Sequence, residues 1–318
     1  MLVRLAPPYC AREDAGMNEG VFRVLEALGH GRDVSRTELV RESGEAHSVI
    51  TQLGKDKPKW FESAGEHFQI SRIGLAALGR ELYARKTPPM DDALLDAFRE
   101  LVSGRPRVKR ELDQVHATLP CVLRRARLLV ESGEAQRGLI FFGDDDLTAL
   151  AVGLVLDRRP GGEHDDKAIR VIDIDDEILA FYESHPRIQP MRHDLRDPLP
   201  RELQRKFGAV FTDPPYTTEG FALFLSRAVT ALKPDGRVYA QLGHSRRARE
   251  RGLHKQRVIA EIGLLVHAWH PHFGEYDGAE SIGSRSDLAV LEMTPQTKPL
   301  SEDRFGDDVA YTRDAPED

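Results

Sequence analysis

The chain has 318 residues, of which 40% are hydrophobic and 31% are charged, and its formal net charge is −7. This composition is typical of a globular protein of one large or two ordinary domains and excludes a disordered chain. The acidic balance argues against a nucleic-acid partner, and no apolar run approaches the roughly 18–20 residues that span a bilayer. Residues 1–14 are too short and too broken by proline for a secretory signal, so we expect a cytoplasmic protein without a membrane partner.

After an N-terminal extension over residues 1–17, residues 18–86 are predicted to form a small domain of helices and one hairpin. Asn18 and Ser35 are placed to cap its first two helices. The order of these helices and strands suggests a winged helix-turn-helix domain. Such a domain could bind DNA, but the acidic net charge of the chain favours a role in dimerisation or as a lid. The helices are expected at 18–28, 35–43, 46–53 and 71–85, and two strands within 60–70.

Residues 87–137 are predicted to be a linker and a helical segment, with helices over 92–101 and from about Pro120 onward. Proline suits the first turn of a helix, which explains its place there. Arg124, Arg125 and Arg127 are expected on a solvated face of this second helix. Cys121 is expected in the core, as free cysteines commonly are.

Strands and helices alternate over residues 138–294, which predicts an α/β fold with a mainly parallel, doubly wound, Rossmann-like sheet. Its last two strands follow each other without a helix and should form an antiparallel hairpin. The acidic tail over 295–318 is expected to be mobile. The strands are expected at 138–142, 169–174, 188–191, 209–212, 237–242, 264–270 and 287–293, and the helices at 147–157, 176–184, 201–206, 221–232 and 249–262.

The turn after the first strand of this sheet carries Gly143 and then three aspartates, Asp144, Asp145 and Asp146. In open α/β folds, nucleotide-like ligands bind at this turn. Phosphate-binding turns fill it with glycines, whose N–H groups meet the anion. Three carboxylates instead repel phosphate and attract cations, so the sequence predicts a positively charged ligand.

Acidic residues also follow the next two strands. Asp173 and Asp175 lie where a carboxylate can accept hydrogen bonds from ribose hydroxyls, and strand alternation predicts that both point to one face. A solvated strand end is the alternative. Asp194, with Leu195 beside it, is placed to bind an adenine amino group or else lies on the surface.

Asp213, Pro214, Pro215 and Tyr216 form the most specific short motif of the chain. The prolines fix an extended turn at the carboxyl end of a strand and hold a carboxylate and a ring toward the cleft. Such a turn can accept hydrogen bonds from an amino group that is about to attack. The alternative is a rigid loop with a surface tyrosine.

The glycine-rich segment 273–286 precedes the last strand. Glu275, Asp277 and Glu280 could add carboxylates over the cleft, and Tyr276 could pack on an alkyl ammonium group. A surface loop is the alternative. The histidines and the two cysteines have no convincing metal-ligand spacing, so we expect no metal.

Seven motifs together resemble the branched-chain polyamine synthases, the N(4)-bis(aminopropyl)spermidine synthase family of the class I S-adenosylmethionine-dependent transferase superfamily. That family also has an N-terminal winged-helix domain, so the resemblance covers nearly the whole chain. Two departures, Leu119-Pro120 and Gly274 (the family more often has asparagine there), concern the acceptor side. The motifs are DQ at 113–114, RRA at 124–126, GDDDLT at 143–148, DIDD at 173–176, DPPYT at 213–217, FGEYDGA at 273–279 and the final SDL strand.

The resemblance implies an aminopropyltransferase that acts from decarboxylated S-adenosylmethionine on the secondary amine of spermidine, as a homodimer and without another cofactor. It implies Asp145 or Asp146 as the base, Asp213 and Tyr216 at the attacking amine, Asp173 at ribose and Asp194 at adenine. Other donor contacts are implied for Gly143, Asp144, Asp175, Leu195 and Pro214, and acceptor contacts for Asp113, Pro215, Glu275 and Tyr276.

Two other functions fit the same residues. The first is an N-methyltransferase that uses ordinary S-adenosylmethionine, since DPPY also occurs in amino-methylating enzymes of this fold. The carboxylates at the first turn would repel its methionine carboxylate. The second is a DNA-binding regulator whose transferase-like domain senses a ligand.

Overall fold

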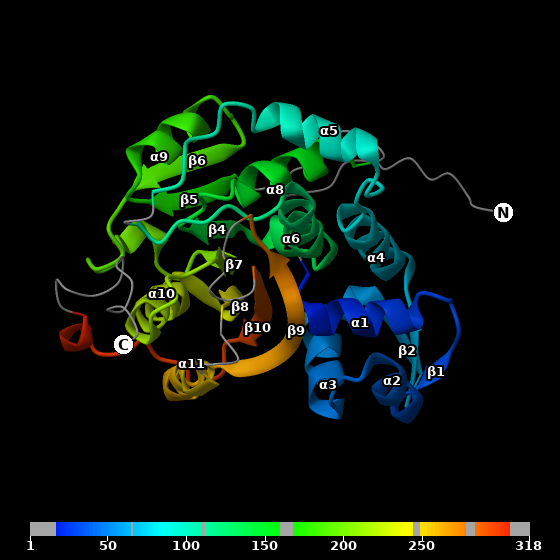
Figure 1. The fold of residues 1–318 in the computed structure, drawn as a ribbon. Coiled ribbons are helices and arrows are strands. Elements are labelled where there is room, and N and C mark those ends of the chain that lie inside the picture. Colours follow the sequence, from blue (N-terminus) through cyan, green and yellow to red (C-terminus); the bar gives the residue numbers. More distant parts are fainter. Residues whose placement is uncertain are drawn as a thin grey trace. The chain divides into compact units, whose positions relative to one another are not determined.

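The computed structural model describes residues 17–64, 66–109, 112–159, 168–243, 249–277 and 284–305. The chain divides between Leu75 and Ala76 into two compact units, each with its own sheet (Figure 1). This division lies inside helix α4 (Arg72–Ala84), whereas the sequence placed a domain boundary at residue 86. The finer division into five parts stays a prediction.

Among its described residues, the first unit contains three complete helices and a three-stranded antiparallel sheet of order β1-β3-β2. The two predicted helix caps are confirmed: Asn18 Oδ1 accepts from the backbone N–H of Val21 at 2.9 Å, and Ser35 Oγ from that of Glu38 at 3.3 Å. The predicted helices and hairpin are present, while the winged-helix assignment stays a prediction. The elements are α1 (Glu19–Leu28), β1 (Val34–Ser35), α2 (Arg36–Ser43), α3 (His47–Asp56), η1 (Pro58–Trp60), β2 (Phe61–Ala64) and β3 (His67–Ile70).

The second unit is the alternating α/β part of the chain. Its helices are α5 (Asp92–Leu101), α6 (Leu119–Glu131), α7 (Glu134–Arg137), α8 (Thr148–Asp157), α9 (Asp176–Glu183), α10 (Thr218–Ala231) and α11 (Arg249–Ile262), with short 3-10 turns η3 (Arg201–Leu203) and η5 (Glu302–Arg304). Its strands are β4 (Leu139–Phe142), β5 (Ile169–Asp173), β6 (Ile188–Arg192), β7 (Phe207–Thr212), β8 (Leu232–Leu242), β9 (Leu265–Glu275) and β10 (Arg285–Glu292).

The seven strands form one mixed sheet of order β6-β5-β4-β7-β8-β10-β9. The first five are parallel, and β10 runs antiparallel to both β8 and β9, which confirms the mainly parallel sheet and the final hairpin. The strand order reverses between β4 and β7, where ligands bind in such folds. Three local predictions were wrong. The strand predicted at 237–242 already begins at Leu232, β9 continues five residues further than predicted to Glu275, and 201–206 contain only a 3-10 turn instead of a helix.

The sheet is buried on both faces because its central strands are apolar throughout. In β4, Leu139 and Phe141 belong to a core cluster with α5, α6, α8 and α9, while Ile140 and Phe142 belong to another with α10 and α11. Cys121 is buried in the first cluster, as predicted. None of the described helices is long and apolar enough to cross a membrane. Residues 306–318 of the predicted mobile tail lie outside the described residues.

Candidate active site

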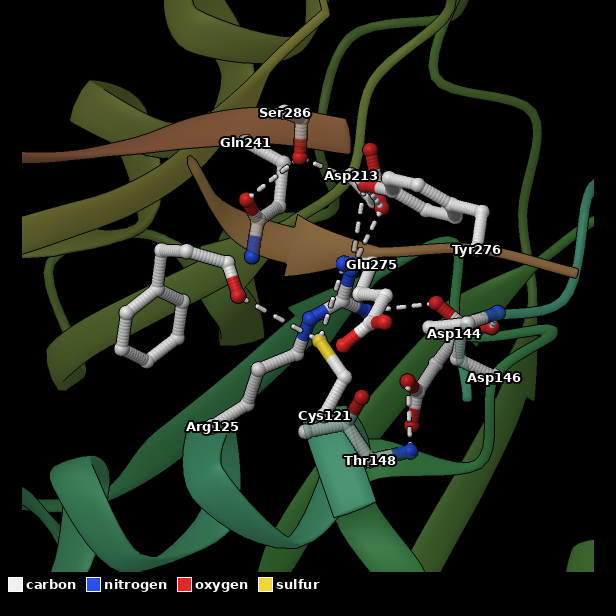
Figure 2. A network of polar contacts seen from close by, with 12 residues as sticks. Cys121, Arg125, Asp144, Asp146, Thr148, Asp213, Gln241, Glu275, Tyr276 and Ser286 are labelled. Atoms are coloured by element: carbon white, nitrogen blue, oxygen red, sulfur yellow. Dashed lines mark hydrogen bonds and ion pairs between the residues drawn. The ribbon is translucent and has the colours of Figure 1, made fainter. Parts of the chain in front are cut away.

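The turn between β4 and α8 does not present its three aspartates equally. Asp144 is buried and turns back onto α8, where its carboxylate accepts from the backbone N–H groups of Thr148 (2.9 Å) and Ala149 (2.8 Å) (Figure 2). The Tyr182 hydroxyl also donates to it at 2.5 Å. Burial raises the pKa of Asp144 to about 6. The interpretation of three carboxylates facing a ligand was therefore wrong for this one, because it caps the helix instead.

Asp146 is held by a buried arginine. Its carboxylate accepts from Arg125 Nη1 and from the backbone N–H of Ala117, both at short range. Arg125 is fully buried on α6, so the prediction that it lies on a solvated face was wrong. Burial alone would lower the pKa of Arg125, but Tyr276, Asp146 and Asp213 raise it well above its ordinary value, so the guanidinium stays charged.

The same guanidinium reaches the carboxylate that follows β7. Arg125 Nη2 donates to Asp213 Oδ2 at 3.0 Å and to the hydroxyl oxygen of Tyr276 at 3.1 Å. The Tyr276 hydroxyl in turn donates to Asp213 Oδ2 at 2.6 Å and lies 2.8 Å from Ser286 Oγ. Figure 2 shows these side chains converging from α6, the loops after β4 and β7, and the end of the β9–β10 hairpin. Burial raises the pKa of Asp213, although Arg125 opposes that shift.

Asp145 differs from its neighbours because one of its carboxylate oxygens has no partner among the described residues. Its Oδ2 atom is inaccessible to solvent and has no hydrogen-bond partner within the described ranges. Burial, followed by the charges of Asp146, Asp213, Asp173 and Asp144, raises the pKa of Asp145 well above its ordinary value. A carboxylate with a buried, unpaired oxygen and a raised pKa is a frequent mark of a functional site.

Asp145 lies in a pocket at the carboxyl ends of β4, β5 and β7, at the point where the strand order reverses. Six residues that the sequence singled out meet there: Gly143, Asp145, Asp173, Asp213, Pro215 and Asp113. Four others complete the lining, namely Leu112, Gln114, Ile174 and Phe224. Four of these ten residues are aspartates, so the pocket suits a cationic ligand. In the described part of the chain, no three histidine, cysteine or acidic side chains are gathered as metal ligands.

The two aspartates after β5 have different surroundings, which corrects the prediction that they share a face. The strand ends at Asp173, whose carboxylate lines the pocket and accepts from the backbone N–H of Asp144 at 3.2 Å. Asp175 instead caps α9, and Lys109 Nζ (2.6 Å) and Gln114 Nε2 (3.1 Å) donate to it. These two partners outweigh burial and lower the pKa of Asp175.

Asp194 and Leu195 lie in the loop after β6 and do not line the pocket. Arg196 donates to the Asp194 carboxylate from its backbone (2.9 Å) and its guanidinium (2.7 Å), and this outweighs burial and lowers the pKa of Asp194. Leu195 is buried, and its carbonyl accepts from Arg227 Nε at 2.7 Å.

The DPPY turn is tied to the segment before α6. The backbone N–H of Tyr216 donates to Asp113 Oδ2 at 3.0 Å, and Asp113 itself adopts a left-handed conformation with φ of 58°. Pro214 and Pro215 are buried, and Pro215 lines the pocket. The Tyr216 ring lies 5.7 Å from the Lys255 ammonium. This proline-stiffened turn therefore carries one pocket carboxylate, Asp213, and its backbone binds a second one, Asp113.

Two predicted acceptor contacts lie apart from the pocket lining. The Glu275 side chain is 46% exposed and pairs with Arg124 at 3.6 Å. Tyr276 is buried, and its ring packs 5.5 Å from the Arg125 guanidinium instead of facing the pocket. Asp277 is described but does not line the pocket, and Glu280 lies outside the described residues.

Sequence reasoning missed Arg125, the hub of the buried network. A signal was present: Val122, Arg125, Ala126 and Leu129 follow helical spacing and are all fully buried, so Arg125 occupies a position of the apolar stripe. Gln114 was quoted within a motif but given no role. Phe224, on α10, looked like any other core residue.

Comparisons with known proteins identify the family of the chain. Residues 93–308 match the model of the branched-chain polyamine synthase A C-terminal domain. An uncharacterized protein of Methanocaldococcus jannaschii is 35% identical over 273 residues, which cover 84% of this chain and 66% of that protein. N(4)-bis(aminopropyl)spermidine synthases of M. jannaschii and Thermococcus kodakarensis are 36% and 33% identical over 52% and 58% of this chain, and the chain spans about half of their length (46% and 52%).

The fold also has a solved counterpart. The crystal structure of the branched-chain polyamine synthase from Thermus thermophilus, in complex with N4-aminopropylspermidine and 5′-methylthioadenosine, superposes with a TM-score of 0.58. The two proteins share 24% identity over 92% of this chain and 91% of the other. This likeness shows that the two share a Rossmann-like, methyltransferase-type fold.

Proposed function

Because the chain belongs to the branched-chain polyamine synthase family, we propose that it transfers aminopropyl groups from decarboxylated S-adenosylmethionine to the secondary amine of spermidine. The observation that carries this proposal is the acidic pocket with the unpaired, buried oxygen of Asp145. The relatives named N(4)-bis(aminopropyl)spermidine synthase support the choice of acceptor.

Charge supports the choice of donor. Decarboxylated S-adenosylmethionine carries a sulfonium and a primary ammonium, and spermidine is a polycation, so both are attracted to a pocket lined by Asp113, Asp145, Asp173 and Asp213. Ordinary S-adenosylmethionine adds a carboxylate, which these groups would repel. The pocket therefore favours the decarboxylated donor over the methyl donor.

The chemistry is a displacement at carbon. The lone pair of the acceptor nitrogen forms a bond to the aminopropyl carbon, and the bond from that carbon to sulfur breaks with its electron pair, which leaves a neutral thioether. The attacking nitrogen must be unprotonated, so a base has to accept its proton. Alignment of nitrogen, carbon and sulfur in one pocket supplies much of the rate.

We propose Asp145 as that base. Its raised pKa makes it a stronger proton acceptor than an ordinary carboxylate, and its Oδ2 atom is unoccupied by any described donor. Asp146 is less suited, because Arg125 and the Ala117 backbone already bind its two oxygens. Asp213 shares Arg125 and would accept a hydrogen bond from the attacking amine, with Tyr216 beside it.

The remaining roles are proposed by position in the pocket. Asp173 would bind ribose and Asp113 a terminal ammonium of the acceptor, since both line the pocket. Asp194 at adenine and Glu275 at the acceptor rest on the family resemblance, because neither lines the pocket and each has an arginine partner.

The first unit is proposed to be a winged-helix domain used for dimerisation of a cytoplasmic enzyme. Residues 17–75 contain eight basic and nine acidic side chains, which is not the basic surplus of a DNA-binding module. Light scattering of the purified protein would give a dimer mass, and a monomer would contradict this part of the proposal.

The function is tested by mass spectrometry of products from the purified protein, spermidine and either donor. We expect aminopropyl additions with decarboxylated S-adenosylmethionine only, and their loss in Asp145→Asn. Methyl additions with ordinary S-adenosylmethionine would instead support the N-methyltransferase. Absence of products with both donors, for spermidine and for a panel of other polyamines, would overturn the proposal.

A further inference from the structure

We propose that Tyr276 is a positioning residue for Asp213, and that Gly274 and Ser286 hold its hydroxyl in place. The inference rests on the proposed aminopropyl transfer, in which Asp213 contacts the attacking amine. The family resemblance implied that Tyr276 contacts the acceptor directly. We propose instead that Tyr276 acts indirectly, through the Asp213 carboxylate.

The first step is the way in which Asp213 is held. Its Oδ2 atom accepts from the Tyr276 hydroxyl at 2.6 Å and from Arg125 Nη2 at 3.0 Å. Its Oδ1 atom has no partner among the described residues, and the side chain lines the pocket. Two donors on one oxygen fix the plane of the carboxylate, so the other oxygen is left for a ligand N–H group.

The second step is the way in which Tyr276 is held. The residue is buried, with 4% of its surface exposed, and its hydroxyl lies 2.8 Å from Ser286 Oγ. The Gln241 amide is satisfied when its nitrogen donates to Ser286 Oγ at 2.9 Å and its oxygen accepts from Arg125 Nε at 3.0 Å. Donation then runs in one direction, from Gln241 to Ser286, from Ser286 to Tyr276, and from Tyr276 to Asp213.

The third step explains a glycine. Gly274 on β9 pairs directly with Ser286 on β10. A Cβ atom at residue 274 would lie 2.0 Å from Ser286 Oγ and 3.1 Å from the Tyr276 hydroxyl. Any larger residue would therefore displace the serine hydroxyl that supports Tyr276.

The decisive variant is Tyr276→Phe, which removes one hydroxyl and leaves Arg125 on Asp213. Loss of one hydrogen bond to a charged group should lower kcat about tenfold, with the donor KM changed less than about twofold. The Tyr276 hydrogen bond lowers the pKa of Asp213. Its removal should therefore move the acidic limb of the pH profile of kcat to higher pH.

Tyr239→Phe is the matched control. It removes another buried tyrosine hydroxyl that donates to a carboxylate, Glu134 Oε1 at 3.2 Å, away from the pocket. It should leave kcat and the pH profile unchanged. If Tyr276→Phe folds and has the wild-type kcat and pH profile, the positioning role is wrong.

The glycine is tested by a double-mutant cycle of Gly274→Ala and Ser286→Ala. Gly274→Ala should lower kcat by up to about tenfold in the wild-type background and less than threefold in the Ser286→Ala background, where the closest collision is gone. Equal effects in both backgrounds would show that Gly274 does not act through Ser286.

A measurement without turnover separates this inference from the proposed function. The carboxyl-carbon NMR signal of Asp213, assigned by its absence in Asp213→Asn, should titrate at higher pH in Tyr276→Phe than in the wild type. If the wild type makes no aminopropyl product but this shift is seen, the function fails and the positioning stands. If the product forms but neither kcat nor the titration changes, the positioning fails alone.

Discussion

At the amino end of the seven-stranded sheet, the fully buried Glu134 accepts from Arg137 at 3.0 Å and from Tyr239 at 3.2 Å, and Arg237 lies 3.8 Å away. At the carboxyl end, Arg125 is shared between Asp146 and Asp213, and no cation of the described residues pairs with Asp145. Both regions are buried and built from the same residue types. The first region surrounds its one fully buried carboxylate, Glu134, with two cations, and the second offers one cation to three pocket-end carboxylates.

This difference separates a structural network from a functional site. A buried charge is tolerated when it is paired, and it costs free energy when it is not. The folded protein therefore does not compensate the ionisation of all the carboxylates at the carboxyl end, and a cationic ligand would compensate it. Counting cations per buried carboxylate locates the site without reference to any motif.

The contrast between the paired Glu134 network and the acidic pocket is tested most strongly by Asp145→Asn. Loss of a general base should lower kcat/KM by about 10³-fold, which corresponds to about 4 kcal/mol. The unfolding free energy should stay the same or rise, since a repelled charge is removed. Product assays and urea denaturation of the same preparation measure both. A variant that is both active and destabilised would contradict the contrast.

Glu134→Gln should have the opposite effect, with a loss of stability and no loss of activity. Removing one partner of a buried ion pair typically costs 3–5 kcal/mol, and here about 3 kcal/mol is expected because Asp235 and Glu292 still pair with the two arginines. The specific activity of the folded fraction should remain at the wild-type level. A large loss of activity with unchanged stability would show that the amino end is not purely structural.

The pH dependence of stability should differ between the wild type and Asp145→Asn. The pKa of Asp145 is raised in the folded protein, so the folded state holds its proton above about pH 4, where the unfolded chain releases it. The unfolding free energy of the wild type relative to the variant should therefore fall as pH rises through that window, by up to about 1.4 kcal/mol per pH unit. A rising difference in urea denaturation between pH 4 and 7 would contradict the raised pKa.

The smallest effect is expected at the rim. Lys109→Met removes the ammonium that lies 2.6 Å from the buried Asp175 carboxylate. The Lys109 side chain is 28% exposed and Gln114 still donates to Asp175, so the change should cost about 1–2 kcal/mol of unfolding free energy. Arg192→Met breaks a far more exposed pair with Asp176 and serves as the control, with no measurable change expected. Thermal denaturation of both variants provides the comparison. If Lys109→Met lowered the unfolding free energy as much as Glu134→Gln does, the partly exposed pair would be as important for stability as the buried network.

Much of the fold could be predicted because its signals are local. Helix Asp92–Leu101 and helix Arg249–Ile262 have the predicted bounds, since apolar spacing and flanking residues define them. The hairpin of β9 and β10 followed from the missing helix between them. The length of β9 could not be predicted, because its extension to Glu275 depends on pairing with Arg285 across the hairpin.

The site was only partly predictable, because sequence shows which carboxylates exist but not which cation each one meets. Asp144, Asp145 and Asp146 look equivalent in the sequence, yet one caps a helix, one is unpaired and one binds Arg125. That arginine lies 21 residues before Asp146, 88 before Asp213 and 151 before Tyr276. Contacts over such separations depend on the tertiary fold.

The cap on α8 has a consequence for the choice of inhibitors. Because Asp144 occupies the first N–H groups of that helix, the end that binds phosphate in many nucleotide-binding proteins already has its anion. Compounds that carry a phosphate or sulfonate group should therefore bind this pocket poorly, whichever nucleoside the group is attached to. Compounds to be screened against the pocket are best ranked by formal charge, and amidines, guanidines and sulfonium mimics should be tested first.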